Sequence, residues 1–541
     1  MVSPSTVSLL LPEILVIATA IGIFMAGVFV GDRRGWSWIA LLGLLLAGGH
    51  LLFGDLPSHE RPGEALYGPV GSDELGYWLR LGSLALGIFF TLMLTSSRAE
   101  GASAEALGAL LLVVAGLMLV SVAKELVMLF VALELISIPT YLLLYLGRGG
   151  LAGHESTSKY FYLSVLASAV LLYGFSFLYG LTGSMRFDEI ARSFATSDVS
   201  GPLPALAVLL VVAGLAFKIA AVPFHFYAPD VYEGTSNLNA GLLAVVPKIA
   251  GIVALVRLVA MVLPAELASL GWQLCLGLSV LTMTLGNVVA LWQNNLRRLL
   301  AYSSIAHAGY MLIGLCVYLS LRAAGAEAVP DGLAALLLYL AVYSLASVGT
   351  FATLIYLGGV EDEGPRRPSP ERVEDLAGLG RSYPVAAVAL SVFMFSLAGI
   401  PPLVGFWGKL GLFYSALSVE VSSDQALLGM PLRSALIALT VIAAVNAAIA
   451  AAYYLRVVAT LYFRSATVSA TLPADASLAG RGGAGFVMGA TMLLVVVLGC
   501  LPGTLVQRSR AVSPRAVDSV SSAASPEAAQ NSAPRPVVVR R

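Results

Sequence analysis

In KIAAVPFH (218–225) and in GIPPLVGFWGK (399–409), proline interrupts a long apolar run, and these two interruptions indicate how the helices are arranged. Proline lacks a backbone N–H and cannot continue a helix without freeing the carbonyl four residues earlier. The freed carbonyls are expected at Ile219, Leu397 and Ala398. In hydrocarbon such a break survives only where protein or a wet cavity satisfies it. Both runs are therefore predicted to be broken membrane helices.

The composition around these breaks is that of a membrane protein. Of the 541 residues, 58% are hydrophobic and only 11% are charged, whereas soluble domains have about 25% charged residues. Lys+Arg and Asp+Glu balance at 31 each, so no basic surface suggests a nucleic-acid partner. The three cysteines each lie alone in an apolar run without a C-x-x-C motif. We therefore expect no disulfide, zinc site, iron–sulfur cluster or haem attachment.

Apolar runs near the length of about 20 residues that crosses a bilayer recur along the whole chain. Their number predicts an all-α polytopic membrane protein of about fourteen transmembrane helices. The runs lie at 9–30, 36–54, 77–96, 105–122, 125–146, 159–181, 203–227, 238–263, 271–292, 298–320, 332–358, 383–417, 433–463 and 483–505.

The two broken helices are the seventh and the twelfth of these runs, five apart. Five is an odd number of spans, so a second copy of a five-helix unit must be inverted in the membrane. Interrupted helices at corresponding positions are typical of transport sites between inverted repeats. The alternative is two unrelated proline kinks.

This periodicity divides the chain into five parts. Three N-terminal helices are predicted within 1–104, the first five-helix repeat within 105–263 and the second, inverted repeat within 264–463. The last span is predicted within 464–507. The tail, 508–541, is rich in Ser, Ala, Pro and Val without periodicity, and we expect it to be disordered.

The loop charges predict an orientation. Basic residues are more frequent in the odd-numbered loops, which hold Arg297 and Arg298, than in the even-numbered loops, to which Arg80 and Arg257 are assigned. Cytoplasmic loops carry an excess of Lys and Arg. Both termini are therefore predicted on the outer, periplasmic side, although Arg508 and later arginines of the tail oppose this.

The predicted spans contain ionisable residues, among them Glu134, Lys218, Lys248, His307 and Lys409. An unpaired charge at the membrane centre costs about 2.5–3.5 kcal/mol on insertion scales, so it persists only with a partner or a wet path. At about 1.5 Å per residue, Glu134, Lys248 and His307 lie near mid-depth, while Lys218 and Lys409 lie beside the two breaks. Desolvation destabilises the charged form of a lysine, and a nearby acid stabilises that form again. A row of such groups can take up and release protons, which predicts a relay.

Each of these residues also has a plainer interpretation. Glu134 and Lys218 could form a fixed structural pair, and Lys248 could extend its charge toward an interface. His307 could be a satisfied core histidine, and Lys409 could lie near the membrane surface. Nothing in the sequence suggests a nucleophile with its base, a phosphate-binding glycine loop or a metal cage.

The stretches that carry these residues resemble the N subunits of proton-translocating NADH–quinone oxidoreductase, respiratory complex I. The combination PFHFYAPDVYEG with a lysine seven residues before its histidine is the most specific feature, and it favours the N subunit over the related L and M subunits. Tyr227 departs from the family, where tryptophan is usual. The resemblance covers roughly 130–410 and also includes LELISIPTYLLLYL, SKYFYLSVLASAVLLYG, VPKIAGIVALVRL, NNLRRLLAYSSIAHAGYMLIG and FSLAGIPPLVGFWGKLGLF.

The resemblance implies fourteen transmembrane helices around two inverted five-helix repeats. It places Glu134, Lys218, Lys248 and Lys409 at the family's proton-translocating positions, with His307 bridging toward the last. It also implies a cell inner-membrane location, and as partners the lipid bilayer, protons and other subunits of the complex, including the antiporter-like subunit M and the small subunit K. This chain is expected to bind no cofactor, because NADH, flavin, iron–sulfur clusters and quinone belong elsewhere in the complex.

Two other functions stay open at this point. One is a subunit of a standalone multi-subunit cation/proton antiporter, which would exchange sodium or potassium without electron transfer. The other is a structural membrane subunit that separates active ones. The main expectation is a subunit of a proton-pumping NADH:quinone oxidoreductase that carries no redox centre itself.

Overall fold

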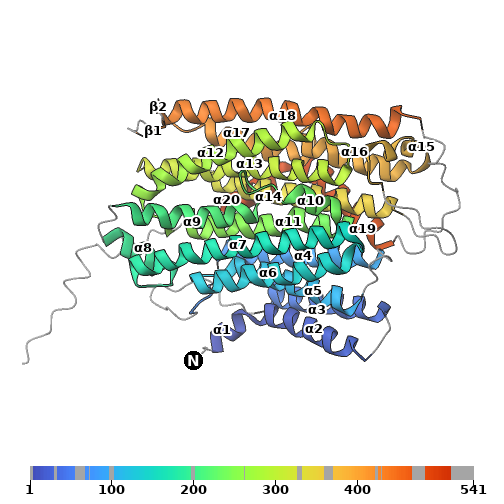
Figure 1. Cartoon of the computed structure of the whole chain (residues 1–541), viewed down its shortest axis with the longest axis horizontal. Coiled ribbons are helices and arrows are strands. Elements are labelled where there is room, and N and C mark those ends of the chain that lie inside the picture. Colours follow the sequence, from blue (N-terminus) through green and yellow to red (C-terminus); the bar gives the residue numbers. More distant parts are fainter. Residues whose placement is uncertain are drawn as a thin grey trace, which may run out of the picture.

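The computed structural model describes residues 4–29, 33–54, 68–71, 73–96, 103–196, 201–260, 262–325, 332–358, 370–420, 425–427, 429–465 and 482–512. These residues form a bundle of helices that run roughly parallel to one another, with the N-terminal helices at one edge and α18 at the other (Figure 1). The described residues are therefore mostly helical, as the sequence predicted.

The first half of the chain contributes helices up to a π-helical segment. The elements are α1 (Pro4–Leu9), α2 (Leu11–Gly27), α3 (Arg33–Phe53), α4 (Glu74–Ser96), α5 (Ala104–Val122), α6 (Leu126–Gly147), α7 (Leu151–Thr182), α8 (Phe187–Thr196), α9 (Pro202–Lys218), α10 (Ala228–Gly234), α11 (Asn237–Ala254) and the π-helix η1 (Leu255–Ala260).

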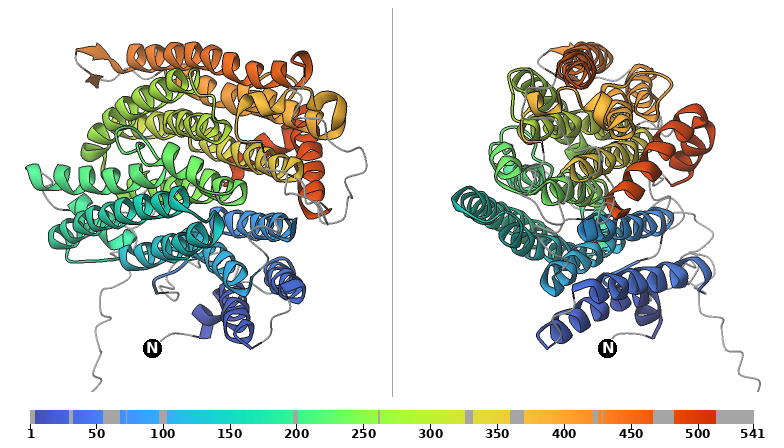
Figure 2. Two further views of the ribbon diagram at one scale, coloured as in Figure 1. Left: turned by 45° about the vertical axis from the view of Figure 1, so that its right-hand side comes forward. Right: turned by 90° about the vertical axis from the view of Figure 1, so that its right-hand side faces the viewer.

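The second half adds further helices and one small hairpin. The elements are α12 (Ala265–Ala290), α13 (Leu296–Ala323), α14 (Gly332–Leu357), the 3-10 helix η2 (Val373–Leu376), α15 (Leu379–Ser382), α16 (Pro384–Ala398), α17 (Val404–Leu417), β1 (Ala426–Leu427), β2 (Met430–Pro431), α18 (Leu432–Phe463), α19 (Gly482–Cys500) and α20 (Pro502–Val512). Helix α19 lies on one flank of the bundle, between its two edges, and packs against α4 and α14 (Figure 2).

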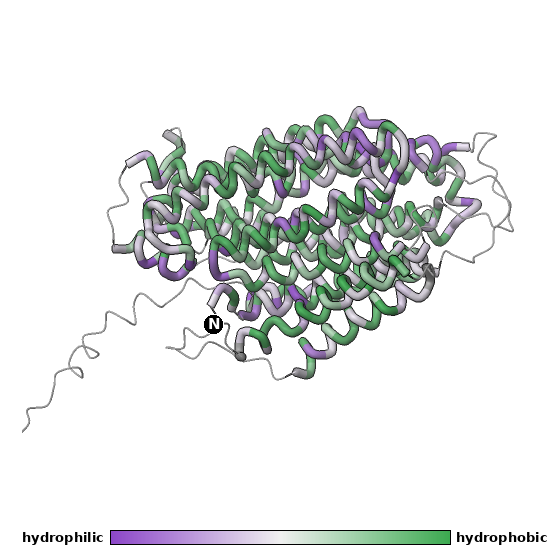
Figure 3. Tube along the Cα trace, turned by 60° about the horizontal axis from the view of Figure 1, so that its bottom comes forward, coloured by the Kyte–Doolittle hydropathy of each residue, from purple (hydrophilic) through white to green (hydrophobic). Residues whose placement is uncertain are grey.

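Eleven helices of the described residues are long and apolar enough to cross a membrane. Hydrophobic residues cover most of their length (Figure 3). Three further runs of the sequence correspond to the shorter apolar helices α2, α9 and α16. Two of these, α9 and α16, are the helices that the prolines interrupt.

Both interruptions lie where the sequence places them. Helix α9 ends at Lys218, and the chain continues without regular helix until α10 begins at Ala228. Ala220 within this gap has φ +56°, a left-handed conformation that only glycine adopts without strain. Helix α16 ends at Ala398, and Gly399 follows with φ +87° before α17 begins. A left-handed glycine after the last turn is a common way to end a helix.

The end of the chain corrects one expectation. Residues 508–512 were expected in a disordered tail, but they belong to α20. Leu505 and Val506 of this helix pack against the core, and the Arg508 guanidinium lies 4.8 Å from the ring centroid of Trp78. These contacts on α4 and α14 stabilise a segment whose own sequence has little helical periodicity. The rest of the predicted tail, 513–541, lies outside the described residues.

Three arginines assigned to loops are instead buried in helices: Arg80, Arg257 and Arg297. Arg80 of α4 is 1% exposed and donates to both carboxylate oxygens of Glu13, at 2.7 and 2.6 Å. Arg257 of η1 is 2% exposed and pairs with Asp73 at 2.8 Å. The apolar sequence around Arg80 and Arg257 gives no sign of these ion pairs, because each acidic partner comes from a distant segment. Removing them from the loop count leaves the direction of the charge bias unchanged.

The Asp73–Arg257 pair predicts a pH-dependent stability. Burial alone would raise the pKa of Asp73, but the charge and hydrogen bonds of Arg257 outweigh it and lower the pKa to about 2. A lowered carboxyl pKa stabilises the fold above the ordinary value and loses this contribution as pH falls toward the folded value. Asp73→Asn should therefore lower the melting temperature at pH 7, and the difference from wild type should shrink between about pH 4 and pH 2. Thermal unfolding in detergent checks this, and a difference that grows on acidification would contradict it.

Candidate functional site

The first break brings Glu134 and Lys218 together. Glu134 lies on α6 and Lys218 is the last residue of α9, and the structure places Lys218 Nζ 3.5 Å from Glu134 Oε1. The side chain of Lys218 is 5% exposed and that of Glu134 is 20% exposed. The pairing predicted from the sequence is thus present, at a separation that leaves room for other partners.

Three serines supply those partners. Lys218 Nζ donates to Ser137 Oγ at 2.8 Å and to Ser164 Oγ and Ser168 Oγ at 3.3 Å each. Ser168 Oγ also donates to Glu134 Oε1 at 2.5 Å. These hydroxyls were not predicted from the sequence. Their spacing offered a signal, because Ser137 follows Glu134 by three residues, while Ser164 and Ser168 are four apart on α7.

Tyr227 supplies a hydrogen-bond donor to a backbone carbonyl at the end of α9. Its hydroxyl donates to the Phe217 carbonyl at 3.0 Å, and its ring stacks on the Phe217 ring with centroids 4.4 Å apart. Tyr227 therefore binds a carbonyl directly beside Lys218. This bond helps to hold the last turn of α9 in place.

Lys248 lies on the next helix, α11, and is 3% exposed. Its ammonium donates to Ser304 Oγ of α13, and this oxygen also accepts from the Tyr343 hydroxyl at 2.8 Å. One turn after Lys248, a Cβ at Gly251 would lie 2.5 Å from Ile219 Cγ2. The helix of Lys248 thus packs directly on the end of α9, although the described side chains form no continuous chain of hydrogen bonds from Lys218 to Lys248.

His307 lies one turn after Ser304 on α13 and is 3% exposed. Its Nδ1 is 2.7 Å from the Tyr339 hydroxyl, and its Nε2 is 3.0 Å from the Tyr454 hydroxyl. Tyr454 also bonds Ser303. Both ring nitrogens therefore have hydroxyl partners, an arrangement that suits a satisfied core histidine and a proton-transfer residue equally well.

Lys409 lies beside the second break. Its ammonium donates to the carbonyls of Leu397 and Ala398 at 3.0 and 2.7 Å, the two carbonyls that the prolines were predicted to free. The Tyr310 ring centroid lies 5.2 Å from the same nitrogen. Lys409 is 5% exposed, so its charge lies inside the bundle.

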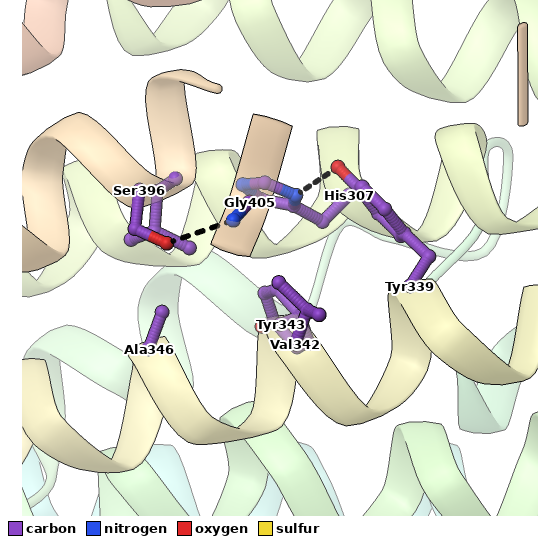
Figure 4. A pocket seen from close by; sticks show the side chains of 8 residues that line it. His307, Tyr339, Val342, Tyr343, Ala346, Ser396 and Gly405 are labelled. Carbon is purple, nitrogen blue, oxygen red and sulfur yellow. Dashed lines mark hydrogen bonds between the residues drawn. The ribbon is translucent and has the colours of Figure 1, made fainter. Parts of the chain in front are cut away.

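A small cavity lies between His307 and the second break (Figure 4). Leu397, whose carbonyl binds Lys409, lines it from one side. The Gly405 N–H donates to Ser396 Oγ across the break at 3.3 Å. The structure therefore brings His307 close to the Lys409 site through this cavity, with further lining from Tyr339, Val342, Tyr343 and Ala346.

A charged cluster fixes α10, the segment after the first break. Arg298 of α13 bonds Asp230 at 2.8 Å and Glu233 at 2.7 Å, and Lys159 of α7 bonds Asp230 at 2.9 Å. Sequence reasoning did not identify this cluster, because its members are far apart along the chain. Within the described residues, no group of three or more His, Cys, Asp or Glu could hold a metal ion.

Comparison with known proteins identifies the family of this chain. Residues 123–430 match the family model described as NADH:quinone oxidoreductase/Mrp antiporter, TM. The chain belongs to this family. The matched range contains Glu134, Lys218, Lys248, His307 and Lys409, so every predicted relay residue lies in the family's transmembrane region.

Relatives in this family include NADH-quinone oxidoreductase subunit N of Rhodospirillum rubrum. It is 37% identical over 463 residues, which cover 84% of this chain and 88% of that protein. Subunit N 1 of Rhizobium meliloti is 35% identical over 465 residues, covering 85% and 89%. The resemblance to the N subunits is confirmed.

Solved structures of the family share the fold. A chain of respiratory complex I from Thermus thermophilus with bound aureothin is 31% identical, with a TM-score of 0.71 over 92% of this chain and 98% of that one. A chain of the Mrp complex from Dietzia has a TM-score of 0.73 over 95% and 98%, at 22% identity. The fold therefore does not separate respiratory subunits from antiporter subunits, whereas sequence identity favours the respiratory ones.

Proposed function

We propose that the chain is a membrane subunit of a proton-pumping NADH–quinone oxidoreductase and that it translocates protons during electron transfer to quinone. One observation carries this function: Lys218, at the end of a broken helix, contacts Glu134 and three serines at once. A permanent structural pair would gain most from one tight geometry. A lysine with several alternative oxygen partners can change partners with little movement.

The relay begins when Lys218 leaves Glu134. Without the neighbouring carboxylate, desolvation favours the neutral amine, so Lys218 gives up a proton in the direction of Lys248. Ser304 and His307, one turn apart on α13, take it onward from Lys248. Lys409 receives it and releases it through the second half. Broken helices supply the hinges and the polar backbone for such movement.

The architecture of the pump is part of the proposal. The chain would have fourteen spans, with both termini on the periplasmic side of the inner membrane. Two inverted five-helix repeats, at 105–263 and 264–463, would place the two breaks at equivalent positions. Neighbouring membrane subunits, with M and K as candidates, would deliver the redox energy. NADH, flavin, iron–sulfur clusters and quinone would be bound by other subunits.

The similarity in fold to the Mrp complex favours one second candidate, a standalone cation/proton antiporter. The two functions differ in their energy source. Purified complex in proteoliposomes should acidify one compartment when NADH and quinone are added, without any sodium or potassium gradient. Cation exchange that continues without electron transfer would instead support the antiporter.

A further inference from the structure

The first break leaves a backbone N–H that needs a partner. Val222 lies in the irregular segment between α9 and α10, is 8% exposed and precedes Pro223. Its N–H donates to Thr282 Oγ1 of α12 at 3.0 Å. Thr282 is fully buried. A buried N–H without an acceptor is costly, so this hydroxyl determines where the broken segment can rest.

Other buried threonines use their hydroxyls differently. Thr353 and Thr440 donate to the carbonyl four residues earlier in their own helices, at 2.8 and 2.9 Å. Such bonds are local to one helix. Thr282 instead accepts from a segment sixty residues away, and it therefore connects two elements.

The helix that carries Thr282 is closely joined to the helix that carries His307. A Cβ at Gly309 of α13 would lie 2.5 Å from Met283 N, and one at Gly286 of α12 would lie 2.7 Å from Ala306 N. Ser279 Oγ also donates to the Gly309 carbonyl at 2.7 Å. Backbones this close move together, because no side chain lies between them to absorb a shift.

We propose that Thr282 is a positioning residue that holds the Lys218 break against the α12–α13 pair. Movement at Lys218 then changes the position of Ser304 and His307, which follow it in the relay. This inference rests on the proposed function, because it assigns to Thr282 the task of keeping the first half-site in register with the second. Thr282 itself carries no proton.

The test replaces the hydroxyl without changing the shape of the side chain. Thr282→Val removes the acceptor, Thr282→Ser retains it, and Thr353→Val is the matched control for loss of a buried threonine hydroxyl. Substitution of residues that couple two sites typically changes the coupling about 2- to 30-fold. In the whole complex, reconstituted in proteoliposomes, Thr282→Val should lower NADH-driven proton pumping by about that factor. Thr282→Ser and Thr353→Val should pump at wild-type rates.

A second measurement separates positioning from simple destabilisation. Residues that act through one another give non-additive effects in a double-mutant cycle. Adding Thr282→Val to Lys218→Met should therefore lower pumping no further than Lys218→Met does alone. Wild-type pumping by Thr282→Val, failed rescue by Thr282→Ser or additive losses in the double variant would each overturn the inference. Wild-type pumping by Lys218→Met would instead overturn the proposed function.

Discussion

Lys218→Met should lower proton pumping by the reconstituted complex about 100-fold or more, the usual range for removal of a group that transfers a proton. Methionine retains the length of the side chain but cannot carry a proton or contact the three serines as an ammonium. The measurement is the number of protons moved per electron in proteoliposomes. A wild-type ratio would refute the relay.

Loss of the lysine also leaves Glu134 without its cation, and breaking a buried ion pair costs about 3–5 kcal/mol. Since the Glu134 side chain is 20% exposed, the cost here should lie below that range. The double variant Lys218→Met/Glu134→Gln removes both charges and should recover assembly and thermal stability. It should still fail to pump. Recovery of pumping together with stability would mean that the pair is only structural.

Gly405→Ala should disrupt the second break and, with it, the Lys409 site. A Cβ at Gly405 would overlap the Ser396 carbonyl, a backbone atom that cannot turn aside. Overpacking of this kind costs about 1–3 kcal/mol or more. Separation of α16 from α17 would also withdraw the Leu397 and Ala398 carbonyls from Lys409. We expect a lower melting temperature and loss of pumping.

Gly411→Ala on the same helix is the matched control. A Cβ there would lie 3.7 Å from the nearest atom, Ala335 Cβ, which is ordinary van der Waals contact. Alanine is favoured over glycine in a helix by about 1 kcal/mol, so this variant should be as stable as wild type or more so. Equal stability and pumping in both variants would show that the close approach at Gly405 is unimportant.

Local physics made several features predictable. The prolines determined where two helices break and which carbonyls they free, and Lys409 occupies the predicted carbonyls of Leu397 and Ala398. Periodic hydrophobicity located the membrane helices. The cost of charge in lipid identified Lys218 and Lys248 before any contact was known.

Other features depend on partners that are distant in the sequence. The apolar context of Arg80 gives no indication of Glu13, and the basic end of α20 is helical because α4 and α14 support it. The loop charges of Asp230 and Arg298 look ordinary until the fold brings them together. Such contacts are absent from any single window of residues.

Composition and residue order are enough to show that this chain lies in a membrane, where two of its helices break and which ionisable side chains are candidates for a relay. Those properties follow from transfer free energies and backbone chemistry, which act residue by residue. The surroundings of each charge depend on the tertiary structure: three serines at Lys218, hydroxyls on both sides of His307 and, in Thr282, an acceptor for the irregular segment after α9. Hydrogen bonds require positions accurate to a few tenths of an ångström, and packing between distant helices sets those positions.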